Sequence, residues 1–129
     1  MAAMFFHVWF AIKRRKWLLN GHFEEVVKHA LFDVADRHSI RVIECETMVD
    51  HVHMLLDLDR PAELSRTMNL LKGGSSHAVG QTMPDWKLDA GSAHLWQKRY
   101  GSKIVPRTAL TAVREYIRTQ KDRPEKYDW

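Results

Sequence analysis

The sequence predicts one α/β domain in which helices cover one face of an antiparallel sheet. Three observations predict this class: segments whose apolar residues alternate with period two, helical apolar stripes between them, and a length of 129 residues, which suits a single hydrophobic core. Apolar residues make up 45% of the chain and charged residues 28%, which is typical of a globular rather than a disordered protein. We therefore expect a single domain over residues 1–129.

The first two elements are predicted to be a strand and a helix. Apolar residues at alternate positions indicate the strand: Phe6, Val8, Phe10 and Ile12. Asn20 is a plausible N-cap for the helix, which we expect to end near His38. Its apolar stripe consists of Phe23, Val26, Val27, Ala30, Leu31, Val34 and Ala35.

The middle of the chain predicts two more strands and a second helix. Arg41–Val49 and Asp50–Leu58 both alternate, and almost nothing separates them, so we expect an antiparallel pair. Pro61 suits the first turn of a helix. The apolar stripe of that helix contains Leu64, Met68 and Leu71. Gly73 and Gly74 leave open whether the helix continues through residues 75–81.

The last part predicts a loop, a strand and a final helix. Met83–Ala93 has the composition of a loop, and His94–Val105 is a strand candidate. Thr108 could cap a helix that carries Leu110, Val113 and Ile117. The order β-α-β-β-α-β matches the split βαβ, or ferredoxin-like, plan that RNA-recognition modules also have, followed by a C-terminal helix. In this plan the second face of the sheet is open to solvent or to a ligand.

The charge of the chain favours a polyanion as partner. Lys and Arg number 20 against 16 Asp and Glu, which gives a net charge of +4 and a pI near 9.4. The excess is clustered in two places, at Lys13, Arg14, Arg15 and Lys16 and at Arg114, Arg118, Lys121, Arg123 and Lys126. These clusters indicate a nucleic-acid partner, and the alternative is that they are ordinary solvated faces.

Several kinds of site and location are excluded or disfavoured. Cys45 is the only cysteine, so neither an intramolecular disulfide nor a cysteine-based zinc cluster can form. No segment is long and apolar enough to span a membrane, and the hydrophobic start of the chain lacks the features of a signal peptide. We therefore expect a cytoplasmic protein with no membrane partner.

The most informative segment for function is Asp50–Asp57. On a strand, His51 and His53 point to one side, while the apolar set of Val52, Met54, Leu56 and Leu58 points to the other. Alternate residues lie roughly 6.5 Å apart on one face, so the two imidazoles could hold one cation. The alternative is two polar residues on the exposed face of a half-buried strand.

A second informative segment lies on the predicted last helix. Tyr116 and Gln120 are four residues apart and therefore share one helical face. A tyrosine oxygen can attack phosphorus and leave a covalent intermediate, but it needs activation because a tyrosine ionises only near pH 10. A divalent cation on the phosphate would supply this activation, and the amide of Gln120 could be its third ligand. The alternative for Tyr116 is ordinary packing at the edge of the apolar stripe.

The two segments together resemble the single-tyrosine HUH transposases. Asp50-His51-Val52-His53 followed by aliphatic residues, the β-α-β-β-α-β order and the late Tyr116-Ile117-x-x-Gln120 helix are similar to the insertion-sequence 200/605 group and its repeat-associated relatives. Further stretches also resemble this family, namely residues 6–9 with 13–15, residues 71–76 and residues 95–100. The resemblance covers nearly the whole chain.

The resemblance implies a reaction and a set of site residues. His51, His53 and Gln120 would hold Mg²⁺ or Mn²⁺, and Tyr116 would attack single-stranded DNA to give a 5′-phosphotyrosine link and a free 3′-hydroxyl. The family also implies recognition of DNA hairpins and a homodimer whose active sites are shared between subunits. DNA contacts are expected from Lys13, Arg14, Arg15, Lys72, Ser75, Ser76, Lys98 and Arg99.

Other readings remain open at this point. A non-catalytic module on the same fold could bind single strands with its open sheet, although the aromatic signature of RNA-recognition modules is missing. A phosphoesterase with two His-x-Ser/Thr motifs is a third possibility, but the sequence contains no such pair. His7 is interpreted as an ordinary surface histidine, with a place near the metal site as the alternative. Glu44, Glu46 and Asp57 are possible additions to that site.

Overall fold

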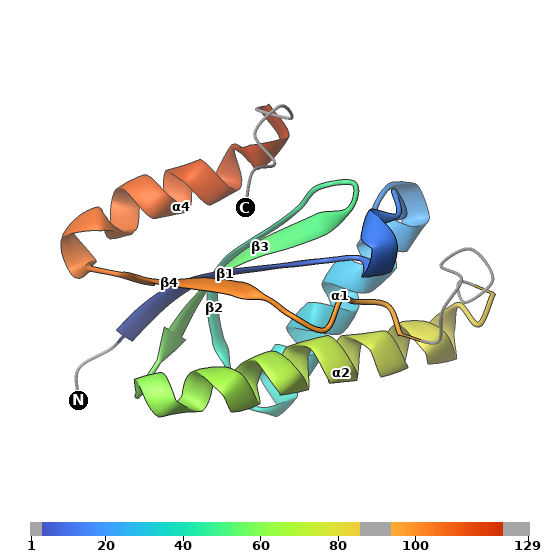
Figure 1. Ribbon diagram of the computed structural model, residues 1–129, viewed down its shortest axis with the longest axis horizontal. Coiled ribbons are helices and arrows are strands. Elements are labelled where there is room, and N and C mark those ends of the chain that lie inside the picture. Colours follow the sequence, from blue (N-terminus) through green and yellow to red (C-terminus); the bar gives the residue numbers. More distant parts are fainter. Residues whose placement is uncertain (1–3, 86–93, 123–129) are drawn as a thin grey trace.

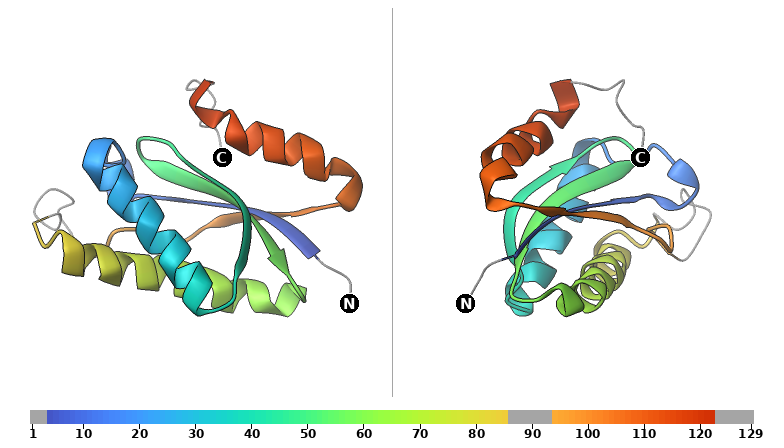
Figure 2. Two further views of the ribbon diagram at one scale, coloured as in Figure 1. Left: turned by 180° about the vertical axis from the view of Figure 1, so that it is seen from behind. Right: turned by 60° about the vertical axis from the view of Figure 1, so that its left-hand side comes forward.

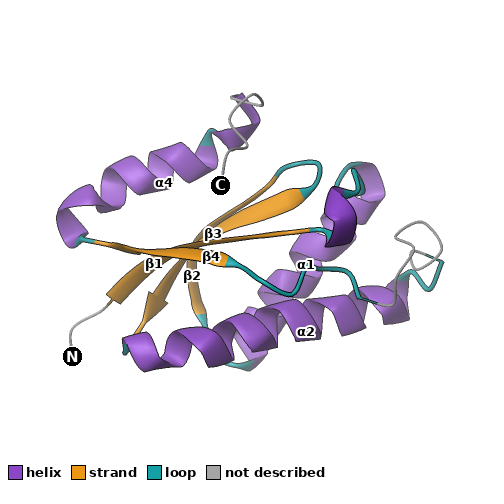
Figure 3. Ribbon diagram, in the orientation of Figure 1, coloured by secondary structure: helices purple, strands orange, loops and turns teal. Residues whose placement is uncertain are grey.

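Four strands form one antiparallel sheet in the part of the chain that the structure describes. The computed structural model describes residues 4–85 and 94–122. The strands are β1 (Met4–Ala11), β2 (Arg41–Thr47), β3 (His51–Leu58) and β4 (Gly101–Val105). Their order in the sheet is β2-β3-β1-β4, and each neighbouring pair is antiparallel. This is the ferredoxin-like arrangement, so the predicted fold class is confirmed (Figure 3).

Helices lie on both faces of this sheet. Helices α1 (Gly21–Arg37) and α2 (Leu64–Thr82) cover one face, and α4 (Leu110–Arg118) lies over the other (Figures 1 and 2). The sequence predicted the second face to be open, and this expectation was wrong for the part beneath α4. Short 3-10 turns are found at Lys13–Arg15, Pro61–Glu63, Arg107–Ala109 and Gln120–Asp122.

The main core lies between the sheet and helices α1 and α2. β1 and β3 contribute the alternate residues that the sequence assigned to the core, namely Phe6, Val8, Phe10, Ile12, Val52, Met54, Leu56 and Leu58. Helix α1 buries Val27, Ala30, Leu31, Val34 and Ala35, as its stripe predicted. Apolar burial of this kind is the main stabilising contribution to a domain of this size.

A smaller cluster fixes α4 to the opposite face. Ile117 of α4 is fully buried against Phe5, Leu55 and Val105, which belong to three neighbouring strands. Tyr116 packs against the edge of this cluster. The apolar stripe of the last helix therefore points at the sheet, and its neighbour Tyr116 is held close to β1 and β3.

Helix α2 continues through its two glycines because one of them allows close packing. A Cβ atom on Gly74 would lie 2.7 Å from Cγ2 of Val34 in α1, closer than side-chain carbons approach. Gly74 therefore lets α1 and α2 come together, and the helix runs on to Thr82. Tertiary packing here offsets the low helix propensity of glycine.

Strand β2 contains one residue more than its partner requires. Val42 pairs with Leu56 and Glu44 pairs with Leu55, so the ladder shifts by one residue between them. Such a bulge lets two consecutive side chains face the same side of a sheet. Ile43 packs against the α4 cluster, and Glu44 bonds to residues of α4.

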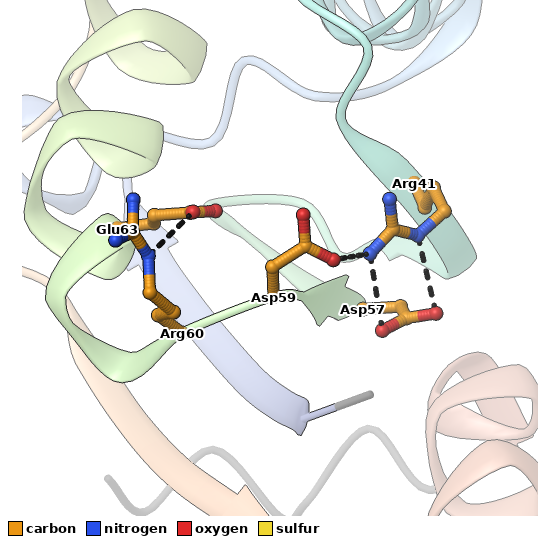
Figure 4. A network of polar contacts seen from close by, with 5 residues as sticks. All are labelled: Arg41, Asp57, Asp59, Arg60 and Glu63. Carbon is orange, nitrogen blue, oxygen red and sulfur yellow. Dashed lines mark hydrogen bonds and ion pairs between the residues drawn. The ribbon is translucent and has the colours of Figure 1, made fainter. Parts of the chain in front are cut away.

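An ion-pair network closes the end of the sheet far from the histidines. The guanidinium of Arg41 on β2 donates to Asp57 at 3.2 Å and to Asp59 at 2.8 Å (Figure 4). Arg60 pairs with Glu63 at the start of the next helical turn. Asp57 is thus bound to Arg41 and lies at the opposite end of β3 from His51, so its suggested addition to the metal site is wrong.

The last strand is shorter than the sequence predicted. Of the candidate range 94–105, only Gly101–Val105 forms a strand, and Trp96 makes an isolated bridge to Ile12. Trp96 is 5% exposed and packs edge-on against Phe10, with its Nε1 donating to Ser75. Packing into the main core thus draws this segment away from the sheet ladder.

No helix in the described ranges is long and apolar enough to cross a membrane.

Candidate active site

The predicted metal ligands lie side by side on the α4 face of the sheet. His51 and His53 are 0% and 3% exposed, and their ring centroids are 5.0 Å apart. The strand alternation predicted this common face, but the alternative of an exposed polar face is wrong. Two buried imidazoles with no part in the main core need another physical reason to be there.

An acidic neighbour fixes the ring of His51. Nδ1 of His51 lies 2.7 Å from Oδ1 of Asp50, and the other carboxylate oxygen of Asp50 accepts a hydrogen bond from Nε of Arg15 at 2.9 Å. When Nδ1 carries the proton and donates it to Asp50, Nε2 carries a lone pair. A carboxylate behind a histidine in this way is a common arrangement around protein-bound metals.

A second histidine fixes the ring of His53. Nε2 of His7 on β1 lies 2.8 Å from Nδ1 of His53, and the two rings are stacked at a centroid distance of 5.1 Å. His7 was interpreted from the sequence as an ordinary surface histidine, and that interpretation was wrong. His7 alternates with the core residues of the first strand, so its side chain faces away from the main core. This alternation was the signal in the sequence that could have placed His7 near the site.

Burial keeps all three histidines neutral near pH 7. Desolvation lowers the pKa of His53 to about 3, with the neighbouring His7 and His51 adding to the effect. Desolvation, with a smaller contribution from Lys103, lowers the pKa of His7 to about 4. The pKa of His51 is also lowered by burial, although Asp50 opposes the shift. Neutral imidazole is the form that binds a metal ion.

Tyr116 lies beside these histidines in the same chain. Its ring centroid is 6.0 Å from that of His7 and 6.2 Å from that of His53, with an edge-on orientation in both cases. Tyr116 is half-buried, whereas Ile117 next to it is fully buried. The packing of Ile117 into the sheet therefore holds the tyrosine beside His7 and His53.

Gln120 follows one turn later and is 1% exposed. Its amide nitrogen donates to the carbonyl of Tyr116 at 3.3 Å, which leaves Oε1 as the end of the side chain still to be satisfied. Oε1 of Gln120 and Nε2 of His53 are buried atoms that make no hydrogen bond within the described residues. Buried polar atoms without a partner are rare because each costs about 1–3 kcal/mol.

These donors fit a divalent cation. Lone pairs on two imidazoles and one amide oxygen suit Mg²⁺ or Mn²⁺ together with water and phosphate oxygens. The described ranges contain no group of three His, Cys, Asp or Glu that could hold a metal, so a site built on the two histidines needs a ligand of another type. The amide oxygen of Gln120 is a ligand of another type, and it makes no hydrogen bond within the described residues.

Ion pairs hold α4 and the turn after it against β2 and α1. Both Arg114 and Arg118 bond to Oε2 of Glu44, at 3.0 Å and 2.8 Å. Lys121 pairs with Glu24 at 2.6 Å and with Glu46 at 3.7 Å. This part of the second basic cluster is thus compensated by carboxylates, and the solvated-face alternative describes it better than a polyanion site. The carboxylates of Glu44 and Glu46 are occupied by these cations.

The remaining members of that cluster, Arg123 and Lys126, lie outside the described residues.

The first basic cluster borders two hollows on the surface. Arg15, Arg99 and Gln97 line one of them, while Lys13, Ser76 and Lys98 line the other. Arg14 is exposed in the 3-10 turn between Lys13 and Arg15. The structure therefore brings together segments that are far apart in the sequence and that the resemblance connected with DNA.

Two predicted DNA contacts have structural partners instead. Ser75 is fully buried; its hydroxyl accepts from Trp96 Nε1 at 2.9 Å and donates to the Lys72 carbonyl, so the predicted contact of Ser75 with DNA is wrong. Nζ of Lys72 donates to the carbonyls of Lys98 and Arg99 at 2.7 Å and 3.2 Å, and burial lowers its pKa. Lys72 thus helps to fix the backbone of Lys98 and Arg99, which line the two hollows.

Comparison with known proteins gives a consistent family. A family model described as "Transposase IS200 like" matches residues 1–120. The ISDra2 transposase TnpA of Deinococcus radiodurans is 28% identical over 118 residues, which are 92% of this chain and 84% of the relative. The transposase for insertion sequence element IS200 of Salmonella typhimurium is 28% identical over 115 residues, covering 89% of this chain and 75% of the relative.

Solved structures show the same fold. A crystal structure described as a transposase from Deinococcus radiodurans R1 superposes with a TM-score of 0.76 and 24% identity, over 93% of this chain and 92% of that one. A REP-associated tyrosine transposase bound to a REP hairpin superposes with a TM-score of 0.67 and 19% identity, over 98% of this chain and 69% of that one. These identities are low, so the likeness is one of architecture.

Proposed function

This chain belongs to the family of IS200-like transposases, and from that premise we propose that it cleaves and rejoins single-stranded DNA through Tyr116. The family makes it a DNA-processing enzyme of transposition. The observation that carries the finer proposal is the pair of buried atoms without a hydrogen bond, Nε2 of His53 and Oε1 of Gln120. The ring of His53 lies 6.2 Å from that of Tyr116, and the amide of Gln120 bonds to the Tyr116 carbonyl. An ordinary core would not leave these atoms unsatisfied.

In the proposed reaction the phenolic oxygen of Tyr116 attacks the phosphorus of a phosphodiester. The bond to the 3′ oxygen breaks, the phenol loses its proton, and the departing 3′ oxygen gains one. The strand is then joined to Tyr116 through its 5′ phosphate. Attack of a 3′-hydroxyl on that link reverses the step and rejoins DNA, because the ester energy has been kept.

The proposed metal ligands are His51, His53 and Gln120, and the ion would be Mg²⁺ or Mn²⁺. Bound there, the cation would draw electron density from a phosphate oxygen and make the phosphorus easier to attack. The residues of the chain do the rest. Asp50 and His7 orient the two imidazoles, and Ile117 together with Glu44 holds the helix that carries Tyr116.

We further propose single-stranded DNA with a hairpin as the substrate and the cytoplasm as the place of action. A structural neighbour is described as bound to a REP hairpin, and basic and half-buried aromatic residues of this chain lie around the site. A homodimer with shared active sites is also part of the proposal. Tyr116 lies beside the histidines of its own chain in the structure, so an experiment must separate the shared from the unshared arrangement.

The test of the reaction is a denaturing gel after incubation with labelled single strands tiled across the flanks of the gene. Wild type with Mn²⁺ is expected to give a slow protein–DNA adduct, and Tyr116→Phe or EDTA should abolish it. Tight DNA binding by wild type without any adduct, under each divalent metal tried, would favour the non-catalytic binding module.

The sharing of active sites is tested by mixing two inactive variants. Tyr116→Phe keeps the metal ligands, and His53→Ala keeps the tyrosine. If sites are shared between subunits, the mixture regains adduct formation. If Tyr116 acts with the histidines of its own chain, as the structure arranges them, the mixture stays inactive.

A further inference from the structure

A hollow of about 400 Å³ opens directly beside the candidate metal site. It is lined by Trp9, Arg15, Gln97, Arg99, Tyr100 and Gly101. These residues come from the end of β1, from the 3-10 turn that follows it, and from the segment that leads into β4. The volume is within the ~300–1,000 Å³ typical of pockets for small ligands.

Trp9 connects this hollow to the histidines. It pairs with His53 on β3 and with Gly101 on β4, so it lies between the metal site and the hollow. Its ring centroid is 4.9 Å from that of His7 and 6.3 Å from that of His53. Trp9 is half-buried on the face of the sheet that α4 only partly covers.

Gly101 has no side chain because the indole of Trp9 occupies that space. A Cβ atom on Gly101 would lie 2.1 Å from Cε2 of Trp9. The glycine therefore lets the indole lie against the backbone of β4. This contact fixes the ring and leaves it as a wall of the hollow, as a stacking platform requires.

The hollow is positively charged at its rim. Arg15 is anchored by Asp50, which also holds His51, so one carboxylate connects the rim to a proposed metal ligand. Arg99 is exposed, and no carboxylate is among the described residues that line the hollow. Gln97 also lines the neighbouring hollow, where Lys13 and Lys98 add further positive charge.

We propose that this hollow binds one unpaired nucleotide of the DNA strand, next to the phosphate that Tyr116 attacks. Its base stacks on Trp9 and beside Tyr100, its phosphate lies against Arg15 and Arg99, and the amide of Gln97 faces the edge of the base. Base–aromatic stacking with a basic rim is the usual chemistry of single-strand binding. This subsite rests on the proposed function, because it is defined by its distance from the scissile phosphate.

The test couples changes in the DNA to changes in the protein. Single strands that form the Tyr116 adduct are prepared with one abasic nucleotide at each position in turn, and binding is measured in the Tyr116→Phe background. At one position next to the cleavage point, the abasic change should weaken binding about tenfold or more. Trp9→Leu should weaken binding of the intact strand similarly and make that position insensitive. Trp9→Phe should retain most of the affinity for the intact strand and most of the sensitivity to the abasic position.

A matched control is Trp17→Leu. Trp17 is 74% exposed and is not among the residues that line the hollow. This variant should keep both the affinity and the sensitivity to the abasic position. Circular dichroism and Mn²⁺ affinity should be the same for Trp9→Leu as for wild type, which shows that the fold and the metal site remain intact.

A second arm covers the case in which Trp9→Leu does not fold. Arg99→Ala changes an exposed side chain, and the DNA partner is a single uncharged methylphosphonate at the same nucleotide. The two changes should each weaken binding, and together they should be no worse than either alone.

The outcomes separate the subsite from the proposed function. An adduct in wild type, with Trp9 and abasic effects that simply add at every position, overturns the subsite and leaves the reaction standing. If no strand forms an adduct, the same scan is run on the strand that the Tyr116→Phe protein binds most tightly. Coupling there without any adduct overturns the reaction, and with it the subsite as a neighbour of a scissile phosphate. An adduct together with coupling at one adjacent position supports both.

Discussion

Nε2 of His7 lies 2.8 Å from Nδ1 of His53, although the two residues are 46 positions apart in the chain. Strands β1 and β3 are neighbours in the sheet, and this pairing brings the first histidine of the chain to the back of a proposed metal ligand. For Nε2 of His53 to offer a lone pair to a metal, Nδ1 must carry the proton and donate it to His7. When Nε2 of His7 accepts that proton, the contact stabilises the tautomer of His53 that can bind a metal.

His7→Ala should lower the affinity for Mn²⁺ by about 10- to 100-fold, which is the usual cost of losing a hydrogen bond behind a metal-bound histidine. His7→Gln offers an acceptor and should recover part of the loss. Titration calorimetry of the DNA-free protein measures this directly. His77→Ala, on an exposed position of α2, is the control. Wild-type affinity in His7→Ala would show that His7 has no positioning role.

Asp50→Ala should damage two properties at once. Asp50 binds the ring of His51 and the guanidinium of Arg15, so its loss should weaken Mn²⁺ binding and also DNA binding measured in EDTA. His7→Ala should weaken DNA binding in EDTA less than Asp50→Ala does, because His7 packs against Trp9 but has no contact with Arg15 or Arg99 among the interactions described. Equal effects of the two variants on DNA binding in EDTA would contradict the link through Asp50.

Gln120→Met should separate stability from metal binding. The buried Oε1 of Gln120 has no partner without metal, so an apolar side chain of similar shape should leave the metal-free protein as stable as wild type or more stable. Mn²⁺ affinity should fall at least tenfold. Chemical denaturation in EDTA and calorimetry with Mn²⁺ give the two numbers. A large loss of metal-free stability would mean that Gln120 serves packing.

Glu44→Ala should loosen the helix that carries Tyr116. Glu44 accepts from both Arg114 and Arg118, which are 43% and 54% exposed at their side chains, so solvent screens both pairs and each contributes little to stability. We expect a small drop in melting temperature and a clear fall in the rate of adduct formation. Hydrogen exchange over residues 110–118 should increase. Glu25→Ala, with an 81% exposed side chain, is the matched control.

The metal-free protein should lose stability as the pH falls from 6.5 towards 4. An unfolded histidine titrates near pH 6.5, whereas burial lowers the pKa of His7 to about 4 and that of His53 to about 3. In this window the unfolded state binds more protons than the folded state, so acid favours unfolding, and the contribution is fully present above pH 6.5.

Urea unfolding in EDTA at several pH values measures this slope. His53→Gln removes one of the titrating groups and should give a shallower slope than wild type. Parallel curves for the two proteins would mean that His53 does not contribute to the pH dependence.

Much of the architecture could be predicted because local patterns determine it. The period-two segments became β1, β2 and β3, and the stripe after Asn20 became α1. His51 and His53 could be placed on one face by strand alternation alone. These features depend on neighbours in sequence, which is the information that a single chain carries most directly.

The remaining features depend on contacts between distant segments. His7 became part of the site through strand pairing, and Ser75 was lost as a DNA contact because Trp96 packs over it. The charges of Arg114 and Arg118 indicated a polyanion until the structure placed Glu44 between them. Such partners cannot be read from spacing, because nothing local specifies them.

The bulge in β2 has a consequence for comparing relatives of this protein. Ile43 is the residue that the ladder does not use, since Val42 and Glu44 take adjacent partners on β3. A relative without this residue could keep every other pairing of the strand, including the contact of Glu44 with the tyrosine helix. Relatives could therefore differ in length by a single codon here and keep the strand pairing, with loss only of the contact between Ile43 and the α4 cluster. Such a gap in an alignment would not mark a decayed copy.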